Sequence, residues 1–408
     1  MRVLKCSAVR AGCAVVFAAW ACVSVRAAET AILPVQISPA VVPPDGHLEL
    51  TYRWDARPMG GNYTVFVHVK NAKGATVMQD DHEPRFPLRT SNWSGAVSYM
   101  RRVALPAGLP DGKYRVFAGI YDRAGQKPLA AGPGVRAEGT VYEIGSFVVD
   151  AKAPRPPLDS DGPRTLDLHG YRMTFHDEFD GPLDVSADGP GTKWTAHTPY
   201  HGDFGDARFA NPGADSPFVV KDGILAITAR KMDGKWRSGL LCSVDPKGAG
   251  FAQQYGYFEM RAKFPRGPGT WPAFWLNGLK NLTDKGAMSF EVDIVEQYGH
   301  RPGGYHGGMI WWRPDHTHDG VGDQFFVADT MAGFHNYGFL WDEKTMRWFF
   351  DGVEVWRQPT PPEAKTPLYV LVNLALGGGW PIDRTPNPSV MLVDYVRVFA
   401  KKQGDVRR

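Results

Sequence analysis

Short runs that alternate between apolar and polar residues constrain the fold of this chain more than any other feature. Residues 63–70 and 256–264 each place their apolar side chains at every second position, as a half-buried strand does. Turn residues separate such runs, and 46 Gly and 33 Pro suit many short strands better than a helical bundle. No Gly-rich phosphate loop is present, which argues against nucleotide chemistry. The predicted fold class is therefore all-β.

A Pro-rich segment, residues 151–165, predicts a linker of limited flexibility between two domains. Residues 28–150 are expected to form the smaller domain, an immunoglobulin-like β-sandwich, because alternating runs are separated by turn signals there. Residues 166–402 form the larger predicted domain. Trp54 and Trp93 of the smaller domain have two interpretations, sugar binding or the core.

The N-terminal residues 1–27 are predicted to be a signal peptide. Basic residues precede an apolar stretch, residues 11–24, that is too short to span a bilayer, and cleavage is expected near Ala27. The alternatives are an uncleaved anchor or lipid attachment at Cys22. The mature protein is expected to be secreted or periplasmic, with no membrane insertion after cleavage.

The charge of the chain and its cysteine content indicate which kinds of partner and site to expect. Four of the 46 Lys and Arg residues and none of the 43 acids lie in the leader, so the remaining chain is close to neutral. It shows no basic stripe that would bind nucleic acid, whereas a neutral polysaccharide requires none. Cys242 is the one cysteine outside the leader, so no internal disulfide is expected. Its apolar neighbours predict a buried, unreactive thiol.

Three acids lie close together in residues 290–298. Glu291 and Asp293 are two positions apart and share a strand face, whereas Glu296 is five positions from Glu291 and would face the opposite way on a regular strand. A β-bulge at Ile294 and Val295 would bring Glu296 back to the face of its partners. Crowded acids repel each other and destabilise the strand. We therefore expect such crowding to be kept for a function.

Retaining glycoside hydrolysis is a chemistry that uses such a pair. It needs two carboxyls about 5–5.5 Å apart, one as nucleophile and one as proton donor and then base. Negative neighbours are expected to raise the pKa of Glu296 so that it remains protonated, and the three acids should titrate as a coupled group. The alternative is a solvated strand face whose acids pair with Lys or Arg, because so short a motif also arises by chance.

Tryptophans accompany this segment in the sequence, and flat aromatic rings stack on the apolar faces of sugars. Any single one of them also fits a core position, Trp275 and Trp312 especially. As a set beside glycines and prolines they favour a glycan cleft. The five residues are Trp271, Trp275, Trp311, Trp312 and Trp380. All of them except Trp312 are predicted to bind substrate.

Several motifs in order make the sequence resemble glycoside hydrolase family 16, the laminarinase-like β-glucanases. The resemblance covers residues 171–400. Its motifs are residues 175–181, 255–261, 271–275, 291–296, 334–338, 373–378 and 394–398. The longer, bulged form of the 291–296 motif resembles the branch of β-1,3-glucanases, agarases and exopolysaccharide glycanases. Residues 373–380 and 395–399 look closest to bacterial exopolysaccharide-degrading members.

The resemblance implies a β-jelly-roll of two stacked sheets with an open cleft. It implies Glu291 as nucleophile, Glu296 as acid/base and Asp293 as the assisting acid. It also implies that His335 contacts the substrate or the acid/base, with a structural hydrogen bond as the alternative.

The resemblance also implies a structural Ca²⁺, held by Glu178, the Gly223 carbonyl and Asp394, because oxygen ligands suit this ion. Residues 311–319 depart from the laminarinase pattern. The polar residues His316, His318 and Asp319 in that segment fit a solvated loop better than a metal site.

The predicted function is a secreted, retaining endo-β-glycanase that hydrolyses β-1,3- or β-1,4-linked polysaccharide, either β-glucan or bacterial exopolysaccharide. The chemistry requires no cofactor, and a monomer is expected. Two alternatives on the same fold are a non-catalytic glycan-binding protein and a transglycosylase.

Overall fold

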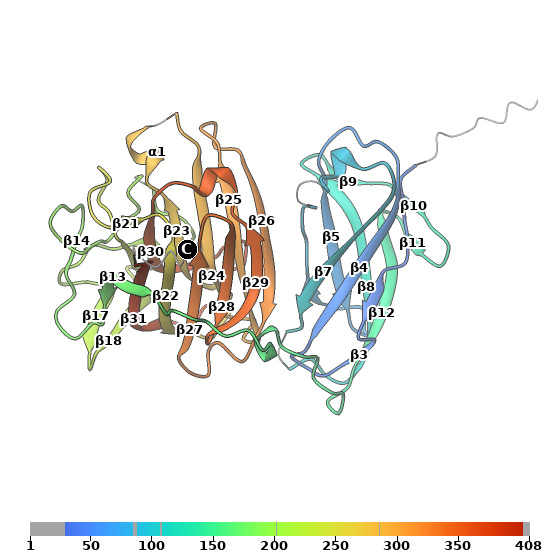
Figure 1. Ribbon diagram of the computed structural model, residues 1–408. Coiled ribbons are helices and arrows are strands. Elements are labelled where there is room, and N and C mark those ends of the chain that lie inside the picture. The colour runs from blue at the N-terminus through green and yellow to red at the C-terminus, as the bar shows by residue number, and fades with distance from the viewer. Residues whose placement is uncertain (1–28, 85–87, 107, 201, 285, 403–408) are drawn as a thin grey trace, which may run out of the picture.

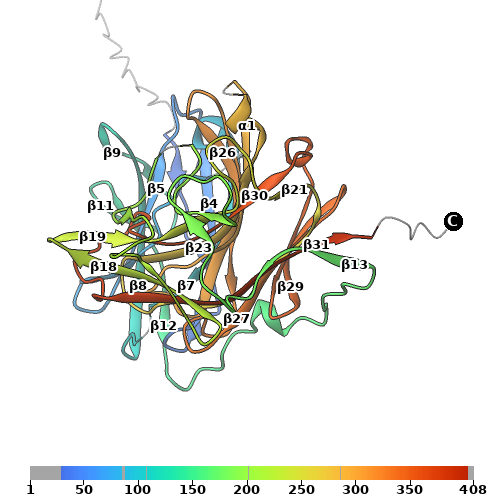
Figure 2. The same ribbon diagram turned by 90° about the vertical axis from the view of Figure 1, so that its left-hand side faces the viewer.

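The computed structural model describes residues 29–84, 88–106, 108–200, 202–284 and 286–402, so the predicted signal peptide lies outside the described residues. The described chain forms two strand-rich domains joined by the Pro-rich segment (Figure 1). Turned by 90°, the larger domain lies in front of the smaller one (Figure 2). The predicted all-β class is confirmed. No helix among these residues is long and apolar enough to cross a membrane.

The smaller domain consists of two sheets. In one, the order is β10 (Ala130–Ala131), β1 (Ala31–Ile32), β4 (His47–Ala56) and β2 (Gln36–Ser38), with β7 (Gly95–Ala104) also paired to β4. In the other, it is β11 (Arg136–Glu138), β12 (Val141–Val149), β8 (Gly112–Asp122), β5 (Thr64–Lys70) and β6 (Thr76–Gln79), with β3 (Val41–Val42) on β12 and β9 (Gly125–Lys127) on β8. The immunoglobulin-like topology stays a prediction.

Trp54 and Trp93 lie in the core of this smaller domain. Their rings pack 4.8 Å apart, and they are 1% and 2% exposed. Of the two interpretations, the structure therefore supports the core.

The larger domain also has two sheets. The first runs β16 (Arg208–Phe209), β19 (Lys235–Ser238), β18 (Ile224–Met232), β31 (Ser389–Lys401), β22 (Gly256–Lys263), β27 (His335–Trp341), β28 (Thr345–Phe350) and β29 (Val353–Pro359), with β13 (Tyr171–Asp177) on β31 and β17 (Phe218–Lys221) on β18. The second runs β14 (Val185–Ser186), β15 (Trp194–Thr195), β20 (Leu240–Cys242), β30 (Leu368–Leu376), β23 (Thr270–Gly278), β24 (Ser289–Glu296), β25 (Gly304–Trp312) and β26 (His318–Phe326), with β21 (Ala252–Gln253) on β30.

The core of the larger domain lies between these two sheets. Phe258 and Met260 of β22 belong to the same buried cluster as Val292 and Val295 of β24. The strand that carries the three acids is thus fixed by its apolar face. Cys242 is fully buried, and burial raises the pKa of its thiol to about 12, in agreement with the predicted unreactive cysteine.

Four short helical turns complete the described chain. They are α1 (Lys280–Thr283) and the 3₁₀ turns η1 (Thr90–Asn92), η2 (Asp159–Asp161) and η3 (Pro362–Ala364). The turn η2 lies within the Pro-rich segment, which is therefore ordered where it passes between the domains.

Candidate active site

The strand β24 contains the predicted bulge. Its pairing with β23 is regular from Glu291 to Asp293 and again at Val295 and Glu296, with one extra residue, Ile294, between them. The register with β25 shifts at the same place, between Asp293 and Glu296. The extra residue restores the parity of the side chains.

The partners on β25 show which face the acids share. Glu291 lies opposite Ile310, Asp293 opposite Gly308 and Glu296 opposite His306. These three partners are spaced by two residues and so lie on one face of their strand, and directly paired residues point to the same side of a sheet. All three acids therefore face away from the core on one side of β24.

Neutral donors hold the two glutamates. Asn277 Nδ2 and Trp312 Nε1 donate to Glu291 Oε2 at 3.0 and 3.1 Å. Trp271 Nε1 donates to Glu296 Oε1 at 3.0 Å. These hydrogen bonds fix the orientation of each carboxyl, as a positioned acid or nucleophile requires.

Burial and the nearby charge of Glu296 raise the pKa of Glu291 to about 8, against the lowering effect of its two hydrogen bonds. The raised pKa was predicted for Glu296 and is found at Glu291. Since the two carboxyls interact strongly, their titration belongs to the pair, which holds one proton between them near neutral pH. The pair therefore has the charge state of a nucleophile and an acid.

Two of the predicted substrate-binding tryptophans lie beside the acids. Trp271 contacts Glu296 and stacks near Tyr298, with ring centroids 6.4 Å apart. Trp380 lines the same cavity as Glu296 and packs against His300 at 4.3 Å. Both rings are thus placed where a sugar chain near the acids would pass.

The two other predicted tryptophans differ in the face of the sheet that they occupy, since Trp275 pairs with Asp293 and therefore lies on the face of the acids. Trp275 is buried, and its Nε1 donates to Asn373 Oδ1 at 2.8 Å within a separate apolar cluster. Trp311 pairs with Phe290 and packs on it at 5.4 Å, on the core side of the sheet. The prediction for Trp311 is corrected, because this residue has the wrong parity. Trp275 is on the acid face but covered by its neighbours, so its contact with substrate stays a prediction.

Trp312 takes the place that Trp311 was expected to fill. It lies one residue further along β25 and therefore on the face of Glu291, to which it donates. Adjacent residues of a strand face opposite sides, so the sequence already implied that Trp311 and Trp312 do not both lie beside Glu291. Asn277 was also missed, and nothing in its local sequence distinguishes it.

His335 lies in the other sheet, on β27. Its Nδ1 is 2.7 Å from Asp351 Oδ2, its Nε2 is 3.2 Å from the Asp329 carbonyl, and its ring stacks on Phe350. The structural alternative holds, and the expected contact with substrate is corrected. The family motif around it thus serves the fold.

The predicted calcium ligands do not fit a metal as their side chains lie. Glu178 accepts two hydrogen bonds from Arg397, at 3.0 and 2.7 Å, and Asp394 is paired with Arg261. Gly223 lies in the turn between β17 and β18, with φ of +74°. Within the described residues, no group of three His, Cys, Asp or Glu side chains is arranged to hold a metal. Each carboxylate is already neutralised by an arginine.

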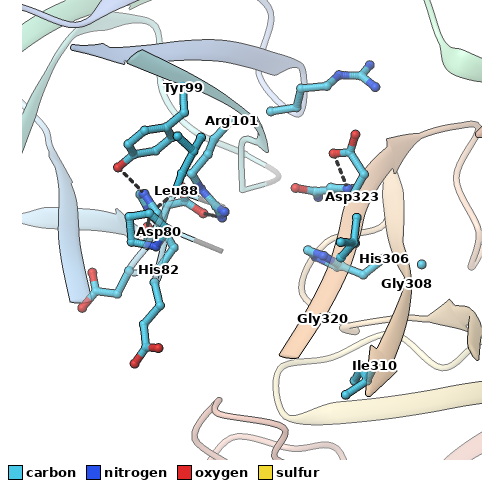
Figure 3. Close-up of a pocket in the computed structure, with 18 of the residues that line it drawn as sticks. Asp80, His82, Leu88, Tyr99, Arg101, His306, Gly308, Ile310, Gly320 and Asp323 are labelled. Atoms are coloured by element: carbon cyan, nitrogen blue, oxygen red, sulfur yellow. Dashed lines mark hydrogen bonds and ion pairs between the residues drawn. The ribbon is translucent and has the colours of Figure 1, made fainter. Parts of the chain in front are cut away.

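A cavity of about 690 Å³ opens over Asp293 and Glu296, within the size range of ligand pockets. Asp293, Glu296 and Trp380 line one part of it, and residues of β25 and β26 continue it. Its opposite wall comes from the smaller domain, whose His82, Tyr99 and Arg101 face β25 and β26 across the gap (Figure 3). No pattern in the sequence predicted a cavity shared by the two domains.

The segment 311–319, whose polar residues were expected to form a solvated loop, lies at this junction. His318 packs on Trp312 at 4.5 Å, and Asp319 pairs with Arg313 and with Arg89 of the smaller domain. His316 has a positive φ of 64° in the turn before β26. The segment therefore positions one edge of the cavity.

Comparisons with known proteins agree with this geometry. The family model of glycosyl hydrolases family 16 matches residues 214–397. The β-glucanase of Rhodothermus marinus is 32% identical over 202 residues, which cover 44% of this chain and 69% of that protein. The endo-1,3-1,4-β-glycanase EglC of Rhizobium meliloti strain 1021 is 37% identical over 196 residues, covering 45% of this chain and 40% of the relative.

Among solved structures, the laminarinase catalytic domain of Thermotoga maritima MSB8 has a TM-score of 0.46 and 24% identity, over 56% of this chain and 98% of that one. The chain spans about two fifths of the length of the first curated relatives that it matches. With a relative matched over most of its length and the family's acid strand in place, the chain belongs to glycosyl hydrolases family 16.

Proposed function

We propose that this protein is a secreted or periplasmic endo-β-glycanase that hydrolyses β-1,3- or β-1,4-linked polysaccharide with retention of anomeric configuration. The observation that carries the proposal is the bulge at Ile294, which brings Glu291 and Glu296 to one face of β24. The relatives named endo-1,3-1,4-β-glycanase and β-glucanase support the substrate class. The sequence of residues 1–27 supports export.

In the first step, Glu296 donates its proton to the glycosidic oxygen while Glu291 attacks the anomeric carbon and forms a glycosyl ester. In the second, Glu296 takes a proton from water, and the water oxygen displaces Glu291. Trp271 holds Glu296, and Asn277 with Trp312 holds the nucleophile, so neither carboxyl needs to reorient.

The raised pKa of Glu291 has a role in this scheme. Without substrate, the pair shares one proton, and its charge repulsion is relieved. A leaving oxygen positioned beside Glu296 accepts a hydrogen bond from a protonated carboxyl, which favours the state with the proton on Glu296. Glu291 is then ionised and ready to attack.

The test is a polysaccharide screen with product analysis. Mixed-linkage β-glucan, laminarin and bacterial exopolysaccharides are incubated with the full chain, and products are identified by mass spectrometry. We expect internal cleavage to oligosaccharides, and NMR of the first product is expected to show the β-anomer. An α-anomer would exclude double displacement, and no cleavage of any polysaccharide would favour a glycan-binding protein.

A variant assigns the acid/base. Glu296→Ala is expected to lose most activity on natural polysaccharide, whose leaving oxygen needs a proton. On an aryl β-glycoside, whose leaving group needs none, added azide is expected to restore turnover and yield a β-glycosyl azide, because azide needs no general base. Recovery of the α-azide would move the nucleophile role to Glu296. Products longer than the substrate would indicate transglycosylation.

A further inference from the structure

The cavity over the acids is shared by both domains. Glu296 and Asp293 of β24 line it together with Asp81, Glu83 and Met100 of the smaller domain. A side chain of the smaller domain that lines this space lies within reach of a ligand whose other end lies on the acids. The smaller domain is therefore part of the cleft and more than an attached module.

The floor between the two walls has few side chains. Asp293 pairs with Gly308 of β25, which pairs with Gly322 of β26, and Ile310 next to them pairs with Gly320. All three glycines line the cavity, and paired residues share a face. The floor thus runs from Asp293 across β25 and β26 toward the smaller domain with few side chains, so a ligand can approach the backbone closely there.

The wall at the end of this path offers groups that suit sugars. Glu83 and Asp81 are exposed carboxylates, which accept hydrogen bonds from hydroxyls, and the exposed Met100 offers an apolar surface. Behind them, His82 Nδ1 donates to the Asp80 carbonyl at 2.8 Å, so its Nε2 accepts the Tyr99 hydroxyl at 2.9 Å. Burial first, and then the Arg101 charge, lower the pKa of His82 to about 4, so it is neutral.

The ion pair between Asp80 and Arg101 fixes this wall from below. Arg101 donates to both oxygens of Asp80 at 2.8 Å. Burial alone would raise the pKa of Asp80, but the Arg101 charge and hydrogen bonds outweigh burial and keep it below its usual range. The wall is therefore preformed, which spares a ligand the entropic cost of ordering it.

Contacts across the junction hold the wall against the floor. Asp159 of the linker accepts Arg102 of β7 at 2.9 Å and the backbone N–H of Phe326 in β26 at 2.8 Å. The ring of His47 stacks on Phe326 at 4.0 Å, and Arg89 pairs with Asp319. These contacts fix the two domains as one cleft-forming unit.

We propose that the smaller domain forms the end wall of the glycan cleft and binds sugar units of the same β-linked chain that Glu291 and Glu296 cut. This inference rests on the proposed function and adds to it. It assigns the domain a place in substrate recognition, with neutral, hydroxyl-rich sugar units held by Glu83 and Met100. The enzyme is then selective for chains long enough to reach from the acids to the wall.

The test compares substrate lengths. The full chain and its Glu83→Ala/Met100→Ala variant are assayed on mixed-linkage β-1,3-1,4-glucan oligosaccharides of increasing length, and kcat/KM is measured for each. We expect kcat/KM of the unaltered protein to rise with length, and the variant to lose about tenfold on the longest chains, as loss of a hydrogen bond to a charged group implies. The loss on the shortest chains is expected to be smaller. Glu138→Ala, on the exposed β11, is the matched control and should follow the unaltered protein.

A domain that only supports the fold would lower the melting temperature and reduce kcat/KM equally at every length. That result, or a variant equal to the unaltered protein at all lengths, would overturn the inference while the proposed function stands. If the unaltered protein cleaves none of these chains, the proposed function fails for this substrate class. Calorimetry then tests the inference by itself. The longest oligosaccharide is titrated into Glu291→Gln, with and without the two wall substitutions. Weaker binding with the substitutions supports the inference, and equal or absent binding overturns it.

Discussion

Glu291 lies in one sheet of the larger domain and Glu178 directly follows β13 of the opposite sheet, and their neighbours have opposite effects on the pKa of the two carboxyls. Asn277 and Trp312, both neutral, donate to Glu291, and burial with the nearby Glu296 raises its pKa. Arg397 donates two hydrogen bonds to Glu178, and these, outweighing burial, lower its pKa. Asp394 resembles Glu178, since it is paired with Arg261.

The difference separates acids that serve the fold from acids that serve chemistry. A structural carboxylate lowers its energy by pairing with a cation. A pair of carboxyls that must share and exchange a proton would lose that ability beside an arginine, because the positive charge would hold both ionised. Strong pKa perturbation by burial and a like charge is a mark of functional sites. The cleft face of β24 therefore carries a stability cost that the opposite sheet avoids.

Activity gives the largest contrast. Glu291→Gln is expected to reduce kcat by about 10⁴-fold or more, because an amide cannot form the glycosyl ester, whereas Glu178→Gln should stay within about threefold. Both substitutions remove one carboxylate from the same domain and keep its shape. The measurement is reducing-end release from mixed-linkage β-glucan. Equal losses in the two variants would break the comparison.

The substitution that abolishes activity, Glu291→Gln, is expected to raise the stability of the protein. Because the folded pKa of Glu291 lies above its unfolded value of 4.5, the native state binds the extra proton, and stability falls as pH rises from about 4.5 to 8. Glu291→Gln removes this penalty. The inactive variant should be more stable than the unaltered protein by on the order of 1–3 kcal/mol at pH 8, and nearly equal to it at pH 4.5. Denaturant unfolding at both pH values measures this, and a pH-independent difference would contradict it.

The partner experiment is Glu178→Gln. The pKa of Glu178 is lowered in the folded protein. The stability that this carboxylate contributes is therefore present above the unfolded pKa of 4.5 and is lost as pH falls through the folded pKa. The pair is partly exposed, so we expect a destabilisation of only about 0.5–1.5 kcal/mol at pH 7, shrinking at pH 3. Glu138→Gln, whose pair with Arg136 is longer and exposed, serves as control and should change less. If Glu178→Gln were as stable as the unaltered protein at pH 7, the pair between Glu178 and Arg397 would not stabilise the fold.

The strand and its bulge were predictable because they follow from parity. Alternation places Val292 in the core, and an odd spacing between two acids can be reconciled only by one extra residue. The same parity rule identifies Trp312 as the ring beside Glu291, and applying it to β25 would have avoided choosing Trp311. Periodic side-chain placement is therefore the most transferable information in this sequence.

Contacts between distant segments were not predictable in this way. Asn277 reaches Glu291 from the neighbouring strand, and Arg89 reaches Asp319 from another domain. Neither residue is marked by local spacing, since such contacts depend on how whole sheets pack. The arginine partners of Glu178 and Asp394 belong to the same class. The family resemblance implied a cation site at Glu178, Gly223 and Asp394, and only the fold shows which arginines neutralise the two acids.

The smallest expected effect concerns calcium, and it tests the structural half of the comparison. A cation at Glu178 and Asp394 would have to displace Arg397 and Arg261. Each carboxylate would then lose its hydrogen bond to an arginine when it binds the metal. We therefore expect that chelation with EDTA, or addition of Ca²⁺, shifts the melting temperature by less than about 1 °C, since a ligand stabilises only in proportion to its binding. A rise of several degrees with Ca²⁺ that is absent in Asp394→Asn would show that the arginines yield to the metal. The two sheets would then differ in the kind of cation that neutralises their acids, an arginine or a metal, and the contrast in pKa between Glu291 and Glu178 would persist.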